Sequence, residues 1–139
     1  MGGNYQNSKS FVLALQAINH YQLVTMKEST ISVNISLDEQ KVPQSISWSA
    51  SDSTADMQQK AKAMMLAFWD GTDKTALRID LWTKEMMVDE MADFYYQTLM
   101  GMADTYHRAT QNIEMTNDMK EFAKNFYKKF RESQLKEAK

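Results

Sequence analysis

Two periodicities meet in the middle of this chain. From Leu77 to Thr83, apolar residues alternate with the others one by one, which is typical of a strand with one buried face. From Val88 to Thr110, apolar residues recur every three or four positions, which predicts a helix with one broad apolar stripe. A strand with one apolar face, followed by a helix with one apolar face, predicts a sheet that is covered by a helix.

The same two periods predict the other elements. A turn at Asp38–Lys41 joins the first two strands as an antiparallel hairpin, and Pro43 belongs at the start of an edge strand because it cannot donate to a ladder. Ser53 or Thr54 caps the first helix, Thr116 caps the last, and the sequence beyond Arg131 is expected to fray. The complete set is strands at 31–37, 42–50 and 75–83, and helices at 57–69, 88–110 and 116–130.

These elements predict an α+β protein in which a small three-stranded, mainly antiparallel sheet has helices packed on one face, in the order β-β-α-β-α-α. A right-handed crossover places the third strand parallel to the second, so the first strand is expected in the middle. The uncovered face of the sheet is expected to be the polar one, with Ser32, Asn34, Ser36, Arg78, Asp80, Trp82 and Lys84.

The length of 139 residues fits one domain. Residues 1–25 differ from the rest of the chain in their sequence pattern. They are interpreted as an N-terminal extension or a misassigned start, with a docking helix as the alternative. Residues 26–139 are predicted to form the single domain.

The amino-acid composition argues against several classes of function. The chain has no cysteine, which excludes disulfides and thiolate chemistry, and its net charge of -2 gives no general attraction to nucleic acid. The longest apolar run, Phe11–Leu15, is too short to cross a bilayer, and residues 1–25 make a poor signal peptide. A soluble cytoplasmic protein without a transmembrane segment is therefore expected. The twelve methionines suit an adaptable core, with a contact surface as the alternative.

Candidate catalytic groups are sparse. Asp104 precedes His107 by three positions on a predicted helix and would orient it as a base or a metal ligand, but a local acid–base pair on the helix surface is the simpler interpretation. Asp89 and Glu90 complement the dipole at a helix start. The four glycines are scattered, so there is no phosphate loop. No catalytic residue, cofactor or metal is predicted.

Charge is distributed unevenly near the C-terminus. Residues 85–118 carry seven acidic side chains and one basic, whereas residues 120–139 carry seven basic and three acidic. We interpret the basic segment as a solvated face, or as the partner of the acidic helix in the same molecule. Binding of RNA through Lys120, Lys124 and Lys128 is the alternative, and the overall charge argues against it.

Trp82 is the most informative single residue. It falls on the polar side of its strand, out of phase with Leu81. A large aromatic residue at such a position is either covered by another segment or available to a partner. The candidate contact surface is therefore the face that carries Arg78, Asp80, Trp82 and Lys84.

Several short motifs, taken in order, resemble the gliding-motility protein GldC family over about residues 26–130. They are Lys41-Val-Pro43 with Ile46 and Trp48, Leu66-Ala-Phe-Trp-Asp70, Leu77-Arg-Ile-Asp-Leu-Trp-Thr-Lys84, Val88-Asp-Glu-Met91 and Met102-Ala-Asp-Thr-Tyr-His-Arg-Ala-Thr110. The resemblance implies a small soluble protein of bacterial gliding motility and its accompanying secretion machinery. It implies no reaction, cofactor or catalytic residue.

The expected function is that of a non-enzymatic accessory protein that binds a protein partner of the gliding apparatus. A homodimer through the same face is a variant of this hypothesis. The alternative is a small-molecule-binding or enzymatic domain with a pocket between sheet and helices, which a pocket containing Asp104, Tyr106 or His107 would favour.

Overall fold

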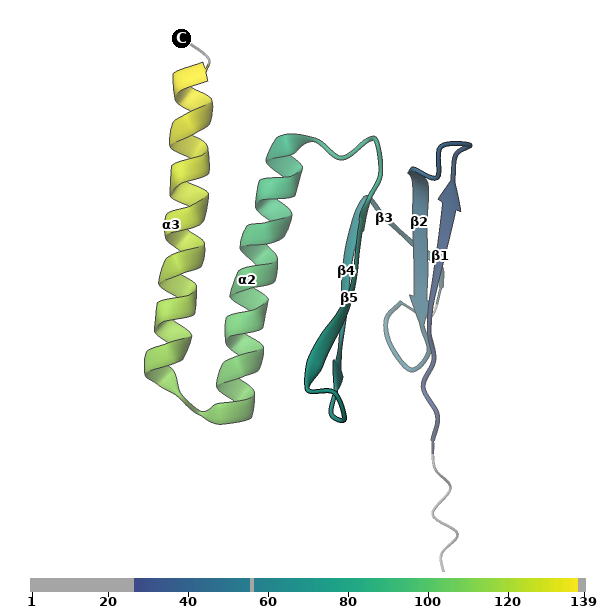
Figure 1. Cartoon of the computed structure of the whole chain (residues 1–139), viewed down its shortest axis with the longest axis horizontal. Helices are drawn as coiled ribbons and strands as arrows, with labels where there is room; N and C mark the ends of the chain where they lie inside the picture. The colour runs from purple at the N-terminus through teal and green to yellow at the C-terminus, as the bar shows by residue number, and fades with distance from the viewer. Residues whose placement is uncertain (1–26, 56, 138–139) are drawn as a thin grey trace, which may run out of the picture. The chain divides into compact units, whose positions relative to one another are not determined.

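The structure, a computed structural model, describes residues 27–55 and 57–137 (Figure 1). The chain divides into the units Met1–Thr30 and Ile31–Lys139, and all the helices and strands below belong to the second unit. The predictions for residues 1–25 lie outside the described residues. The elements are β1 (Ile31–Leu37), β2 (Pro43–Ala50), β3 (Gln59–Ala61), β4 (Ala63–Asp70), β5 (Thr75–Trp82), α2 (Val88–Thr110) and α3 (Ile113–Glu137).

The predicted α+β class is confirmed, but the arrangement of the strands is not the predicted one. The strands form two antiparallel sheets, one with the order β1-β2-β3 and one made of β4 and β5. The predicted single sheet, with the first strand in its middle, is wrong. The segment predicted as the first helix supplies β3 and β4, and this removes the crossover on which the predicted order depended.

The hairpin of β1 and β2 is confirmed, with Val33 opposite Trp48 and Ile35 opposite Ile46. Its turn is held by the Asp38 carboxylate, which accepts hydrogen bonds from the amides of Gln40 and Val42. β2 is the central strand and not an edge strand as predicted. Pro43 is accommodated because it lies at the start of β2, beyond the residues that pair with β3.

The two faces of this sheet differ sharply in chemistry. The pairing register places Ile31, Val33, Ile35 and Leu37 on the same face as Ile46, Trp48 and Ala50. The opposite face of β1 and β2 carries Ser32, Asn34, Ser36, Ser45, Ser47 and Ser49. Ile46 is only 2 % exposed, whereas Ile31 is 71 % exposed, so the apolar face is covered in part and open in part.

The helix predicted at residues 57–69 is wrong. β4 pairs with β5 from Ala63 opposite Trp82 to Asp70 opposite Thr75. The stretch from Ala63 to Trp69 is apolar on both faces, so helical and strand periods fit it equally well. Pairing with β5 makes this stretch a strand and not a helix. The Asp70 carboxylate closes the hairpin by accepting hydrogen bonds from the amides of Thr72 and Asp73.

The two C-terminal helices are confirmed, α2 with its predicted bounds and α3 with changed ones. α2 ends at Thr110 and is capped by Gln111, whose φ of 56° is left-handed and whose amide donates to the carbonyl of His107. Asn112, not Thr116, caps α3, since its side chain accepts the amide of Met115 at 3.0 Å. The Thr116 hydroxyl instead donates to the carbonyl of Asn112. α3 continues to Glu137, past the predicted fraying point.

α2 and α3 run antiparallel and side by side (Figure 1). Ala103 and Ala123 are fully buried, and small residues at these positions let two helices approach closely. The rings of Tyr96 and Tyr127 stack with centroids 4.9 Å apart. Alanines and stacked tyrosines therefore make the seam of this helical pair.

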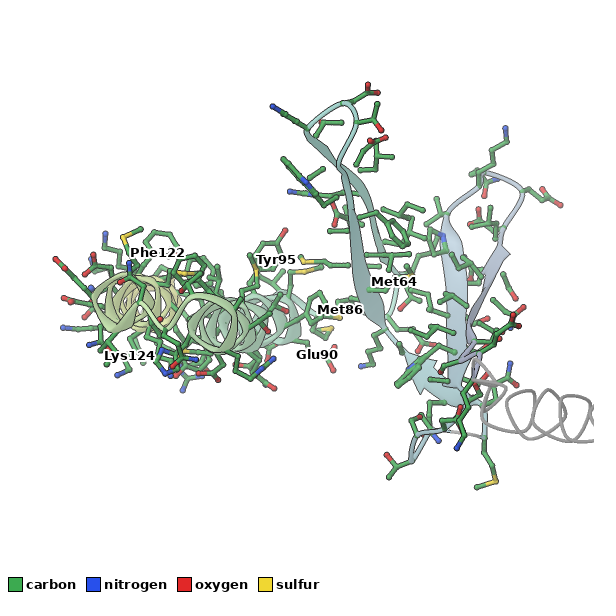
Figure 2. The ribbon with its side chains drawn as sticks, turned by 90° about the horizontal axis from the view of Figure 1, so that it is seen from below. Met64, Met86, Glu90, Tyr95, Phe122 and Lys124 are labelled. Atoms are coloured by element: carbon green, nitrogen blue, oxygen red, sulfur yellow. The ribbon has the colours of Figure 1, made fainter. Side chains whose placement is uncertain are left out.

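The buried core is small. Among the described residues, the buried hydrophobic side chains are Ile46, Ala55, Ala92, Ala103 and Ala123. Much larger apolar side chains remain exposed, including Phe68, Trp69, Leu77, Ile79, Trp82 and Phe122. Figure 2 shows Phe122 on one side of α3 and Lys124 on another. Unit 31–139 thus leaves much apolar surface for other contacts.

Replacement of Ile46 by alanine should lower the free energy of unfolding by about 2–5 kcal/mol, because it removes most of a buried aliphatic side chain. Ile46 is the largest side chain that is fully buried among the described residues. Urea unfolding monitored by circular dichroism measures the change. Leu135→Ala is the control, since Leu135 is 70 % exposed and its loss should alter stability by no more than about 0.5 kcal/mol. Equal effects of the two replacements would contradict this packing.

Candidate protein-binding surface

Three of the four predicted contact residues share one face of the β4–β5 hairpin. Arg78, Asp80 and Trp82 alternate along β5, and the register places Met65 opposite Asp80 on that face. The guanidinium of Arg78 lies 2.6 Å from the Asp80 carboxylate, and this pairing raises the pKa of Arg78. Trp82 itself is 58 % exposed. The strand therefore presents an aromatic side chain next to an ion pair.

Lys84 does not belong to this face. It lies beyond β5, and its ammonium group pairs with the Asp38 carboxylate in the turn between β1 and β2. The hydrogen bond from Lys84 and the amide of Val42 lower the pKa of Asp38. Lys84 thus connects the end of β5 to the β1–β2 turn.

The Trp82 face is not the polar, uncovered face that the sequence predicts. A hollow of about 540 Å³ adjoins Trp82, and its other lining residues come from α2, the segment before it and α3. The reason is that β4 contributes Ala63, Met65, Ala67 and Trp69 to the same face, which is therefore largely apolar. The helix lies beside the apolar patch that these residues make with Trp82. We call this hollow the Trp82 hollow, lined by Trp82, Met86, Met87, Val88, Met91, Ala92, Tyr95, Phe126 and Phe130.

A second, smaller hollow of about 230 Å³ continues the first along the hairpin. Trp82, Met91 and Tyr95 line both, and Asp80 and Phe94 are added in the smaller one. Figure 2 shows Tyr95 projecting from α2. Methionine side chains are flexible and polarisable, so a lining that contains several of them adapts to apolar groups of different shapes. The two hollows together suit an apolar side chain or segment better than a charged metabolite.

An ion pair joins the start of α2 to the strands. Lys62, between β3 and β4, lies 2.6 Å from Glu90 in the first turn of α2. The pairing lowers the pKa of Glu90, with a further contribution from the amide of Met87, and it raises the pKa of Lys62. The carbonyl of Lys62 also accepts the amide of Thr83 at 2.8 Å. Lys62 therefore contacts both the end of β5 and the start of α2.

The candidate catalytic residues lie elsewhere. Asp104 pairs with Lys120 of α3 at 2.6 Å, and this contact lowers the pKa of Asp104. Neither Asp104, Tyr106 nor His107 lines either hollow. The Nδ1 atom of His107 is buried without a hydrogen-bond partner in the protein.

The acidic and basic segments meet in part across the helical pair. Asp104 and Lys120 join α2 to α3, and Tyr127 of α3 hydrogen-bonds to Asp93 of α2, which raises the pKa of Tyr127. These contacts agree with the interpretation that the basic helix pairs with the acidic helix of the same molecule. They occupy Lys120, one of the three lysines considered for RNA.

Residues 27–55 and 57–137 contain no cluster of histidine and carboxylate side chains that would hold a metal ion. Neither helix in this part of the chain has a stretch long and apolar enough to span a bilayer.

The fold and the hollows define an α+β protein with an open apolar surface between a strand hairpin and a pair of helices. Residues 43–132 match the family of gliding motility-associated GldC-like proteins, and because the match covers more than half of the chain, the protein belongs to this family. The predicted resemblance is thereby confirmed. Neither the curated proteins nor the solved structures gave a match.

Sequence periodicity alone misses the residues that β4 and the β5–α2 connection add to the surface. It places Met65 on a helix and gives no role to Met86 and Met87. The available signal is length: an apolar run of about eight residues bounded by turn residues favours a strand over a helix. Met86 and Met87 carry no comparable signal, because their position depends on the path of a short connection.

The Lys62–Glu90 pair should make stability depend on pH in the acid range. Because the pKa of Glu90 is lower in the folded than in the unfolded chain, the pair stabilises the fold above the ordinary value of 4.5, and this contribution is lost as the pH falls through the folded-state pKa. Glu90→Gln should therefore be less stable than the wild type near pH 7, and this difference in stability should shrink as the pH falls below 4.5. Urea unfolding at several pH values measures this difference. Glu39→Gln, in an exposed turn, is the control, and a difference for Glu90→Gln that persists unchanged in acid would contradict the pairing.

Proposed function

We propose that this protein is a non-enzymatic, cytoplasmic accessory protein of gliding motility and its associated secretion machinery, and that it acts by binding another protein. Membership of the GldC-like family supports the assignment to the motility process. The observation that carries the binding mechanism is the Trp82 hollow, an apolar, methionine-rich surface beside a half-exposed tryptophan. No catalytic residue, cofactor or metal is assigned.

The chemistry of the hollow specifies what it binds. Its lining is aliphatic, aromatic and thioether, with Tyr95 as the one side chain that has a hydroxyl group. An apolar anchor from the partner, such as a leucine or phenylalanine side chain, would gain free energy by leaving water there. The adjacent pairs Arg78–Asp80 and Lys62–Glu90 supply a polar rim that limits the orientation of a bound segment.

An enzymatic function has less support. The alternative required a pocket with Asp104, Tyr106 or His107, and those residues do not line the two hollows beside Trp82. A catalytic site also requires a positioned acid, base or nucleophile at the place where substrate binds. Asp80 is the one carboxylate that lines these hollows, and it is already paired with Arg78.

Affinity capture from cells that express the protein natively tests the proposal. Trp82→Ala should reduce the recovery of the partner by at least about tenfold, because central aromatic residues contribute most of the binding free energy in many interfaces. Quantitative mass spectrometry of the captured proteins measures the loss. Circular dichroism first verifies that the variant is folded.

Trp69→Ala is the matched control. Trp69 lies on the same face of the hairpin, is 69 % exposed and does not line either hollow, so its replacement should leave the recovery unchanged. Retention of every partner by Trp82→Ala would overturn the proposed site. Equal loss with both variants would show that the binding depends on general hydrophobicity and not on the hollow.

A further inference from the structure

Within residues 27–55 and 57–137, no strand, charged side chain or proline protects the outer edge of β1. It pairs with β2 on one side, and no described strand pairs with its other side. Its sequence, Ile-Ser-Val-Asn-Ile-Ser-Leu, contains no charge and no proline, and its one irregularity lies at the end, between Ser36 and Leu37. Natural sheets blunt exposed edges with lysine, proline or bulges, because an unmodified edge pairs readily with another strand.

The apolar–polar pattern of β1 is the same in both directions, so two copies of the strand match when they run antiparallel. If Asn34 is placed opposite Asn34 of another copy, Val33 faces Ile35 and Ser32 faces Ser36 across the axis. All side chains then remain on their own face, aliphatic with aliphatic and polar with polar. A shift of one residue would place apolar side chains on the serine face, so the chemistry of the two faces selects the register.

Charge also favours a copy of this chain. β1 and β2 contain no ionisable side chain, so two copies brought together about a two-fold axis place no like charges opposite each other. The apolar face of β1 is exposed by 71 % at Ile31, 38 % at Val33, 36 % at Ile35 and 53 % at Leu37. A two-fold interface must be self-complementary, and an uncharged strand with a symmetric pattern meets that condition.

We propose that two copies of this protein associate by antiparallel pairing of their β1 strands about a two-fold axis through Asn34. The pairing joins the three-stranded sheets of the two copies into one continuous sheet and extends its apolar face across the axis. The β1 pairing uses a different surface from the Trp82 hollow. The failure of one proposal would therefore leave the other unaffected.

Single cysteines test the register, because the natural chain has none. Asn34→Cys should form an intermolecular disulfide under mild oxidation, since directly opposed residues in an antiparallel pair have Cα atoms about 4.5–5.5 Å apart, within the range of a disulfide. Non-reducing electrophoresis should show most of this variant as a dimer. Full-length protein is used throughout.

Matched cysteines at other positions fix the geometry. Ser32→Cys and Ser36→Cys should each remain largely uncross-linked alone, because their copies lie about 13 Å apart along the strands, but an equimolar mixture should cross-link. Ser45→Cys, on the same face but in β2, is the control for collisions and should not cross-link. Cross-linking of Ser45→Cys as readily as Asn34→Cys would overturn the proposal.

The mass in solution completes the test. Light scattering should give twice the chain mass for the wild type, and Ile35→Lys should weaken association by at least about tenfold, because it places a charge on the joined apolar face. Ser32→Cys, kept reduced, should retain the dimer. A monomeric wild type would overturn the proposal. A dimer without the Asn34 cross-link would also overturn it and would indicate association through the Trp82 face. Capture of a foreign strand in place of a second copy would overturn it as well.

Discussion

The dominant constraint on this protein is the small amount of apolar side chain that it buries within its own described fold. Among the described residues, Ile46 is the one large side chain that is fully buried, and most of the other buried hydrophobic residues are alanines in the helical pair. Domains of this size are held together mainly by apolar burial, which opposes a conformational entropy of similar size. The exposed apolar faces therefore matter for the stability and function of the protein as much as its interior does.

Specific polar contacts determine where those faces lie. Lys84 pairs with Asp38, and Lys62 pairs with Glu90, so one lysine holds the β1–β2 turn to the end of β5 and the other holds the start of α2 to the strands. Exposed pairs of this kind contribute little to stability on average. Their effect here is local: Lys62–Glu90 joins the strands to the start of α2, which lines the Trp82 hollow, and Lys84–Asp38 joins the β1–β2 turn to the end of β5. Within the described chain, the outer edge of β1 is unpaired. One surface suits an apolar partner segment, and the other suits a second copy.

Much of the fold followed from periodicity, and the errors have identifiable physical causes. The alternation at residues 31–37 and 75–82 and the helical spacing at 88–110 predicted those elements correctly, because each has one apolar and one polar face. The segment 57–69 failed because it is apolar on both sides. That error also gave the wrong strand order and hid the part of β4 that surrounds Trp82. In the candidate site, alternation placed Arg78, Asp80 and Trp82 together, whereas the pairing of Lys84 with Asp38 depends on residues far apart in sequence.

The proposed pairing of β1 strands requires that the edge and apolar face left open by one chain are covered by a second copy in the stable protein. The most direct measurement is the urea midpoint of unfolding over about a hundredfold range of protein concentration. Association of folded chains couples to folding by mass action, so the midpoint should rise with concentration. A midpoint that stays constant, with the stability of an ordinary monomeric domain, about 5–15 kcal/mol, would contradict the association of two copies.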